Sequence, residues 1–387
     1  MVTGRDSMKQ KAICILGMHR SGTSAITRSI NLLSAHIGQE SDLVPPDYYN
    51  SEGFWERKDV VEFHESLQRK FKTTWDSVIP LSEDWHLSED IKSYKEELKD
   101  LIRNAFTEYP LWAWKDPRTC IFVEVWKDVL KELDVDTVFL HIIRNPLDVV
   151  RSFERIKNFN RGGVLGTWLN YNRTALRATS GHCRAFIHYD KFMQDWEGEL
   201  RRVFRELGLD WPTDCSAFRN EMSQFIRPGM RHSVSTIDDL RNIGAPGIVI
   251  ELYQLLEDAC LGVTVADGEF DSKVGKISGE YAAQAYFFSE YMKRLHDKTE
   301  ALKNTQDTLK NTQDALKNTQ DALKNTQDTL KNTQDALKNT QDTLKNNEDA
   351  LKNTQDALKN NEAHIAAILN SKSWKLTAPL RKIGKLI

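Results

Sequence analysis

The sequence predicts an α/β fold, a three-layer sandwich with a central parallel sheet, followed by a long C-terminal heptad-repeat helix that forms a coiled coil. Short apolar stretches alternate with helical patterns in the N-terminal part, which is typical of parallel strands covered by helices on both faces. From about Glu300 the composition changes to a seven-residue repeat. A chain of 387 residues is long enough for one large domain or two ordinary ones.

The first strand, residues 12–16, is followed by the loop Gly17–Ser24 and a helical pattern over residues 25–33. A strand, a glycine-containing loop and a helix start form a site for phosphate, because loop N–H groups and the helix dipole point at the anion. The spacing of Gly17 and Gly22 matches the nucleotide P-loop, which favours a P-loop NTPase-like sandwich. Thr23-Ser24 stands where the P-loop lysine is expected, and the loop's cation is Arg20. This combination indicates a phosphate donor other than ATP.

Further strands and helices follow in alternation. A polar loop at 39–49, with Pro45-Pro46, continues through 50–56, and residues 75–90 are irregular. We expect strands at 111–115, 137–143 and 185–189, and helices around 60–67, 91–109, 121–133, 146–153 and 192–207.

Three polar segments follow predicted strands: the loop 17–24, the segment 115–118 and Arg144. Ligands of parallel sheets bind at the carboxyl ends of the strands, so these segments should converge. Arg144 stands at a strand end, and Ser152 lies eight residues later in the next helix. The two loops therefore predict a ligand with phosphates at two places.

Composition excludes several classes of protein. The net charge of −3 gives no sign of nucleic-acid binding. Five scattered cysteines without a CxxC pair favour reduced thiols and a cytoplasmic setting. Residues 1–10 are polar and resemble no signal peptide, and the apolar stretches are too short to span a bilayer. We expect a cytoplasmic protein, in solution or peripheral at the inner membrane.

The repeat places leucine at every seventh residue from Leu302 to Leu358, with threonine or asparagine three residues later. A helix over 300–362 would be about 95 Å long. With leucine at position a, every second seam position is polar, so the predicted seam is weak. We interpret the repeat as a spacer helix that pairs into a homo-oligomer; the alternative is a flexible polar tail.

The C-terminal segment 363–387 combines apolar residues, including Trp374, with lysine and arginine and contains no acidic residue. A basic amphipathic segment of this kind is typical of contact with a membrane surface or a partner. The alternative is a helix that caps the coiled coil.

Several motifs resemble sulfotransferases. Gly17–Ser24 resembles their 5′-phosphosulfate loop, and residues 143–152 resemble their 3′-phosphate motif. Residues 50–56, 114–118 and 188–193 are similar to segments of bacterial carbohydrate-type sulfotransferases. The resemblance covers about residues 11–235; the family's C-terminal Arg-Lys-Gly segment has only a loose counterpart at 227–231. Together with the change of composition, it divides the chain into 1–10 (tail), 11–298 (sulfotransferase-like catalytic domain), 299–362 (heptad-repeat coiled coil) and 363–387 (basic amphipathic segment), of which the last two lie outside the resemblance.

The resemblance implies the donor 3′-phosphoadenosine 5′-phosphosulfate (PAPS) and transfer to a carbohydrate or glycoconjugate hydroxyl, such as a cell-surface polysaccharide or its precursor. Arg20 would act in catalysis, and Lys115 and Arg118 would bind substrate. We expect no metal. The predicted donor-binding residues are Arg20, Ser21, Gly22, Thr23, Ser24, Arg144 and Ser152.

The acceptor hydroxyl needs a general base within hydrogen-bond reach. Glu56 is the first candidate because it follows the loop expected beside the acceptor; Glu52 and His64 are alternatives. His19 is interpreted as a packing residue. Two other functions stay open: a nucleotide-dependent kinase, disfavoured by the missing lysine, and a coiled-coil scaffold with a degenerate domain.

Overall fold

Four parallel strands form the central sheet in the computed structural model of the protein. They are β1 (Lys11–Leu16), β2 (Leu111–Lys115), β3 (Asp136–Ile143) and β4 (Arg184–His188), in the spatial order β2-β1-β3-β4. Cys14 of β1 lies opposite Trp114 on one side and Phe139 on the other. All four expected strands are present and parallel, which confirms the predicted sheet.

The structure describes residues 10–48, 50, 52–156, 159–212, 216–226, 233–262 and 267–378. The chain divides into two units, Met1–Lys293 and Arg294–Ile387. The helices are α1 (Thr23–Leu32), α2 (Lys58–Lys70), α3 (Lys92–Phe106), α4 (Thr119–Glu132), α5 (Pro146–Glu154), α6 (Arg161–Ala178), α7 (Tyr189–Gln194), α8 (Trp196–Glu206), α9 (Ser216–Phe225), α10 (Ile237–Asn242), α11 (Gly247–Cys260), α12 (Asp267–Asn370) and α13 (Lys372–Leu376), with short 3₁₀ turns at Glu40–Asp42, Trp85–Leu87 and Glu89–Ile91.

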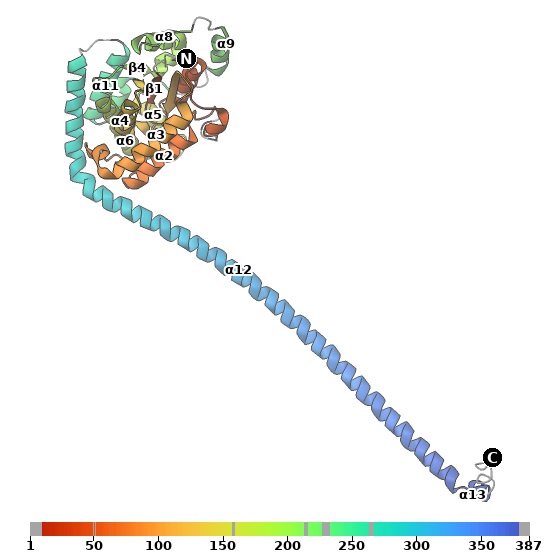
Figure 1. Cartoon of the computed structure of the whole chain (residues 1–387). Helices are drawn as coiled ribbons and strands as arrows, with labels where there is room; N and C mark the ends of the chain where they lie inside the picture. The colour runs from red at the N-terminus through yellow and green to blue at the C-terminus, as the bar shows by residue number, and fades with distance from the viewer. Residues whose placement is uncertain are drawn as a thin grey trace. The chain divides into compact units, whose positions relative to one another are not determined.

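Helices cover both faces of the sheet and give the predicted three layers (Figure 1). Successive side chains of a strand point to opposite faces. Cys14 therefore packs into the core formed with α2 to α6 and α11, whereas Ile13 and Ile15 pack against α1, α8 and α9. The apolar strands follow from this burial on both sides.

The helix expected at 192–207 is two helices, so this prediction was wrong in detail. Tyr189 begins α7, and the backbone leaves the helical conformation at Asp195, where φ is −143°. The Asp195 carboxylate then accepts a hydrogen bond from the Gly198 N–H (2.9 Å) and caps α8. The spacing of apolar residues does not reveal the break, because both helices face the same core.

Helix α6 was not predicted, because most of its residues are buried on several sides and leave no amphipathic pattern. Its contacts hold the backbone just after β3 and the segment at Trp75. Trp168 donates from its indole to the Arg144 carbonyl (3.3 Å), and Tyr171 donates to the Trp75 carbonyl (2.7 Å).

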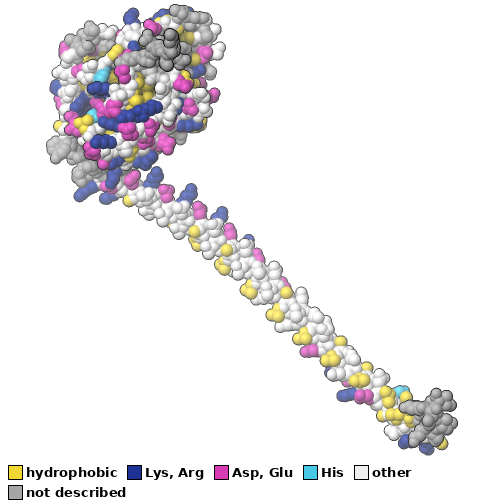
Figure 2. All heavy atoms as spheres, in the orientation of Figure 1, with side chains coloured by type: hydrophobic (Ala, Val, Ile, Leu, Met, Phe, Trp, Pro, Cys, Tyr) yellow, Lys and Arg dark blue, Asp and Glu magenta, His cyan; other side chains and the backbone are white. Residues whose placement is uncertain are grey.

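The C-terminal repeat is helical, which argues against the flexible-tail alternative. Helix α12 starts much earlier than the predicted residue 300 and extends to Asn370. Its first turns belong to the N-terminal unit, where Phe270, Val274, Ile277 and Tyr281 are buried at helical spacing. In the second unit the heptad leucines are exposed; Figure 2 shows hydrophobic side chains recurring along one side of the helix.

The basic segment 363–387 lies partly outside the described residues, which end at 378. Its described part completes α12 and adds the short helix α13, whose first turn is capped by Ser371. Within the described ranges, no helix combines the length and apolarity needed to cross a membrane.

Candidate active site

The loop between β1 and α1 follows a path that requires glycine. Gly22 has φ = +84° and forms the N-cap of α1. A Cβ at this position would lie 2.0 Å from the Tyr189 ring, so a side chain is excluded by space as well as by backbone conformation. Gly17 is also confined, because a Cβ there would meet the Ile142 carbonyl at 3.0 Å. The loop therefore lies close against β3 and Tyr189.

This loop presents free donors at the positive end of α1. Within the described part of the chain, the N–H groups of Gly22, Thr23 and Ser24 donate no hydrogen bond. The first turn of α1 contains no acidic residue. Both features suit an anion. Ser21 and Thr23 are buried at this turn.

The second predicted loop meets the first. Asn145 caps α5 by accepting from the Leu147 N–H (2.9 Å), and Pro146 occupies its first turn. This arrangement brings Ser152 to within 3.0 Å of the Arg20 Nε, which donates to its hydroxyl. Arg144 donates to the Arg20 carbonyl (2.8 Å). The loop 17–24 and Arg144 therefore converge as expected, and Ser152 lies beside Arg20.

Arg144 retains an unused donor. Its side chain is buried, its guanidinium lies 4.8 Å from the centre of the Tyr189 ring, and its Nε has no hydrogen-bond partner among the described residues. A buried donor left unsatisfied costs free energy, and a phosphate oxygen is a suitable partner for it. The residues therefore fit a donor that carries a second phosphate.

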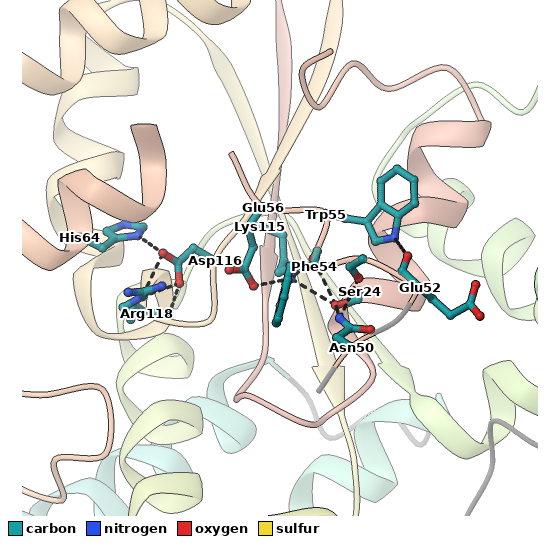
Figure 3. A network of polar contacts seen from close by, with 11 residues as sticks. Ser24, Asn50, Glu52, Phe54, Trp55, Glu56, His64, Lys115, Asp116 and Arg118 are labelled. Atoms are coloured by element: carbon teal, nitrogen blue, oxygen red, sulfur yellow. Dashed lines mark hydrogen bonds and ion pairs between the residues drawn. The ribbon is translucent and has the colours of Figure 1, made fainter. Parts of the chain in front are cut away.

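The acceptor side of the loop is organised by Lys115, at the end of β2 (Figure 3). Its Nζ donates to the Glu56 carboxylate (2.6 Å) and to the Phe54 carbonyl (2.5 Å), and lies 3.5 Å from the Ser24 hydroxyl. The Ser24 hydroxyl also donates to Phe54 and accepts from Asn50. The side chain of Ser24 therefore binds the segment 50–56, and its backbone N–H alone is left for the donor.

Glu56 has the surroundings of a general base. Lys115 occupies its Oε1, whereas its Oε2 forms no hydrogen bond within the described chain. Burial raises the pKa of Glu56; Lys115 opposes this shift and Asp116 adds to it. One carboxylate oxygen is held in place by Lys115 while the other is available.

His64 does not fit the role of base. The ring is fully buried, its Nδ1 lies 2.9 Å from the Asp116 carboxylate, and its Nε2 accepts from the Trp126 indole (2.9 Å). The indole can only donate, so Nδ1 carries the proton and the ring is neutral. Burial lowers the pKa of His64, which agrees with this tautomer. His64 therefore orients Asp116.

Arg118 is tied to the same carboxylate. Its Nε donates to Asp116 (3.0 Å) and its terminal nitrogen to Glu65 (3.0 Å). Although burial opposes the shift, His64 and Arg118 hold the pKa of Asp116 well below its usual range. Asp116 is thus an ionised anchor beneath the site.

Two further residues considered from the sequence are Glu52 and His19. Glu52 is exposed, and Figure 3 shows its side chain extending away from Glu56 and Lys115, which disfavours it as the base. His19 packs edge-on against Trp75 (5.1 Å between ring centres), as expected for a packing residue. Burial lowers its pKa to about 3.

Sequence reasoning assigned no role to Tyr189, Asn50 or Trp126. Tyr189 lies against Gly22 and Arg144, Asn50 bonds Ser24, and Trp126 fixes the His64 tautomer. Tyr189 follows β4 directly, and a polar aromatic residue at the carboxyl end of a strand is the signal that could have identified it.

Comparison with known proteins places the sequence in a family. The sequence matches the sulfotransferase family over residues 12–213, more than half of the chain. No curated protein sequence matches it.

Similar solved structures include three bacterial sulfotransferases. A sulfotransferase domain from the curacin biosynthetic pathway is 17% identical (TM-score 0.32; 59% of this chain and 82% of that chain covered). Sulfotransferase STF1 from Mycobacterium tuberculosis H37Rv is 14% identical (0.34; 66% and 77%), and a sulfotransferase domain from the Synechococcus PCC 7002 olefin synthase is 16% identical (0.35; 72% and 96%). By the family match, the chain belongs to the sulfotransferase family.

Proposed function

We propose that this protein transfers a sulfuryl group from PAPS to a hydroxyl of a carbohydrate or glycoconjugate, such as a cell-surface polysaccharide or its precursor. The observation that carries the proposal is the meeting of Arg20, Arg144 and Ser152 at one edge of the sheet in a member of this family. A donor with phosphate groups at two places suits two adjoining loops.

The donor would be held by groups of both loops. The N–H groups of residues 22–24 and the Arg20 guanidinium suit the 5′-phosphosulfate, and Arg144 with Ser152 suits the 3′-phosphate. When bound, PAPS supplies an activated sulfuryl group on a phosphate leaving group. Fixed donors at the loop stabilise negative charge that develops there, as in phosphoryl transfer.

On the acceptor side, Glu56 accepts the proton of the attacking hydroxyl through its free Oε2. Lys115 holds the other carboxylate oxygen and acts as a positioning residue, because its side chain is only 1% exposed and its amine already contacts three oxygens. This assignment replaces direct substrate binding by Lys115. Arg118, held by Asp116 and Glu65, supports the same cluster from below.

A cavity beside this segment supports a sugar acceptor. It has a volume of about 490 Å³ and includes Trp55, Arg28, Lys58 and Glu52 in its lining. An aromatic ring combined with charged groups offers sugars an apolar face and hydrogen bonds. Glu56 is not among the lining residues, so this cavity suits a part of the acceptor other than the reacting hydroxyl.

We propose a cytoplasmic setting, with peripheral membrane contact through residues 363–387. The described cysteines, Cys14, Cys120, Cys183 and Cys260, are free thiols, which suits a reducing compartment. Burial raises the pKa of Cys120 to about 12, so this thiol stays protonated.

The donor can be tested by calorimetric titration with 3′-phosphoadenosine 5′-phosphate and, separately, with ATP. We expect the first to bind more tightly. Arg144→Ala should weaken its binding at least tenfold, since a hydrogen bond to a charged group contributes about 1.5–3 kcal/mol. Arg241→Ala, an exposed arginine on α10, is the matched control.

Tighter binding of ATP would favour a kinase, and no binding of either nucleotide would favour a scaffold. Transfer of labelled sulfate from PAPS to surface-glycan fractions tests the acceptor. Labelling of protein or lipid in place of glycan would contradict the acceptor class but not the donor.

A further inference from the structure

The exposed apolar residues of the second unit, Arg294–Ile387, form a continuous seam. Large exposed hydrophobic residues recur every seven residues, at position a of the heptad, from Leu295 through the leucines of the repeat to Ile365. The seam thus extends beyond the repeat at both ends. At its C-terminal end Ile368 also occupies position d. Each repeat leucine is 57–59% exposed, although leucine is usually buried.

The threonines at position d are less polar than their residue type suggests. The hydroxyls of Thr305, Thr312, Thr319, Thr326, Thr333, Thr340 and Thr354 each donate to the carbonyl four residues earlier, at 2.8–2.9 Å. Their hydrogen-bond donors are therefore satisfied within the same helix. Burial of these residues in a seam leaves no unpaired O–H and brings the γ-methyl groups into contact. Every second seam position is still threonine or asparagine, as the sequence predicts, but the satisfied threonine hydroxyls lower the cost of burying them.

Charge is kept away from most of this seam. From the heptad of Leu302 to that of Leu351, lysine stands at position b and aspartate at position f, as in Lys324 and Asp328, which are outward positions of a coiled coil. Glu348 and Glu362 are the exceptions in the repeat, at the flanking position e. The flanking positions e and g carry glutamine and alanine or threonine through most of the repeat, as in Gln327 and Ala322. The same helix can therefore pack against itself without bringing like charges together.

We propose that the partner of this seam is further copies of the same chain, arranged parallel and in register. Near-identical heptads alone would allow slips of seven residues. Asn347 and Asn361 break this degeneracy, because they replace threonine at position d only near the C-terminal end. Their amides form no hydrogen bond within the described chain. Each can pair with its own counterpart only in a parallel, in-register assembly, as a polar core residue fixes register in other coiled coils.

The residue types at positions a and d also bear on the number of helices in the coiled coil. Leucine at a with isoleucine at d shifts coiled coils from two helices toward higher numbers, and threonine at d shares the branching of isoleucine at Cβ. The catalytic units of all copies are then joined to the same end of the paired helices. With the proposed function, one assembly would then carry several active sites for the same polymeric acceptor.

The first experiment measures the mass of the full-length protein by sedimentation equilibrium at micromolar concentration. We expect at least two chains, and a helix-melting temperature that rises with protein concentration. Leu323→Asp with Leu330→Asp should give monomers. Asn325→Asp with Asn332→Asp adds the same charge at the outward position c and should leave the assembly intact. A monomeric wild-type protein would overturn the proposal, as would equal dissociation by both double variants.

The second experiment tests orientation and register by oxidation in a Cys183→Ser background. Thr312 lies far from the centre of the helix, so it meets its counterpart in a parallel assembly but not in an antiparallel one. Thr312→Cys should therefore form an intermolecular disulfide, and Asp314→Cys at the outward position f should not. In a mixture of chains carrying Thr312→Cys or Thr319→Cys, disulfides between the two variants report a slipped register. These should be rare and should increase with Asn347→Thr and Asn361→Thr. Failure of Thr312→Cys to cross-link in an assembled protein would overturn the parallel arrangement.

Discussion

Lys115 Nζ lies 2.6 Å from Oε1 of Glu56 in the buried part of the site. This contact holds one carboxylate oxygen in place and leaves the other to accept a proton. Glu56→Gln should retain the contact with Lys115 but lose the base. We expect kcat to fall about 10²–10⁴-fold, while binding of 3′-phosphoadenosine 5′-phosphate stays within about twofold. Glu62→Gln, an exposed residue on α2, is the matched control. A variant with nearly full kcat would assign the base elsewhere.

The pH profile gives an independent test of the same residue. Glu56 must be ionised to accept a proton, and burial raises its pKa above the ordinary value of 4.5. Activity should therefore rise with pH along an acid limb whose midpoint lies above 4.5. Lowering the pH through that midpoint protonates the base and lowers kcat/KM. The limb should be absent from the residual activity of Glu56→Gln; its persistence there would point to another group.

Gly22 illustrates a constraint on the donor loop that is both steric and conformational. A methyl group would meet the Tyr189 ring at 2.0 Å, with φ at +84°. We expect Gly22→Ala to lower the free energy of unfolding by about 1–3 kcal/mol and donor affinity at least tenfold. Gly275→Ala, on an exposed face of α12 with no atom within 4 Å, should be neutral or slightly stabilising. Equal effects of the two substitutions in thermal melts and calorimetry would contradict the close contact.

Sequence alone could identify the residues whose positions follow from the order of strands, loops and helices along the chain. Arg20, Arg144 and Ser152 follow strands at fixed intervals, so their convergence could be predicted. The choice among Glu56, Glu52 and His64 could not, because it depends on which side chain contacts Lys115 and which is bonded to Asp116 and Trp126. Those contacts join residues more than fifty positions apart.

Among the secondary-structure elements, the four strands and the covering helices were predictable because burial on both faces leaves continuous apolar runs. The break at Asp195 was not, since it depends on a carboxylate that bonds the Gly198 N–H in preference to continuing a helix. Helix α6 escaped prediction because its surroundings are apolar on several sides. The early start of α12 is a tertiary effect, in which its first turns fill the core.

The cap at Asp195 can be tested by its stability. Asp195→Ala removes the acceptor of the Gly198 N–H and should lower the free energy of unfolding by about 1 kcal/mol in urea titrations. Asp210→Ala, at an exposed position beyond α8, is the matched control and should change it by less than about 0.5 kcal/mol. If both variants unfold at the same denaturant concentration as the wild type, the carboxylate contributes nothing as a cap.

At the scale of the whole molecule, helix α12 belongs to both units. Its first turns bury Ile277 and Tyr281 in the N-terminal core, and Arg173 lies 4.7 Å from the Tyr281 ring centre. Ile277→Ala should therefore destabilise the N-terminal unit by about 2–5 kcal/mol. Leu316→Ala, in the second unit, should leave the unfolding of the N-terminal unit unchanged, because its side chain is exposed there. The melting temperature of each variant can be measured by near-ultraviolet circular dichroism. Equal decreases for Ile277→Ala and Leu316→Ala would contradict this division.

The same division predicts where the chain can be shortened. A protein that ends at Lys298 retains Phe270, Val274, Ile277 and Tyr281, which are the buried hydrophobic residues of α12 among the side chains that the structure describes. We expect it to fold, to bind 3′-phosphoadenosine 5′-phosphate within about threefold of the full-length affinity, and to be monomeric, because the heptad seam is gone. A protein that ends at Gly262 lacks Phe270, Val274 and Ile277 and should fail to fold stably. Transfer to a short soluble acceptor should survive the first truncation, whereas transfer to a polymer should drop. Loss of donor binding by a folded 1–298 protein would show that the stalk contributes to the active site.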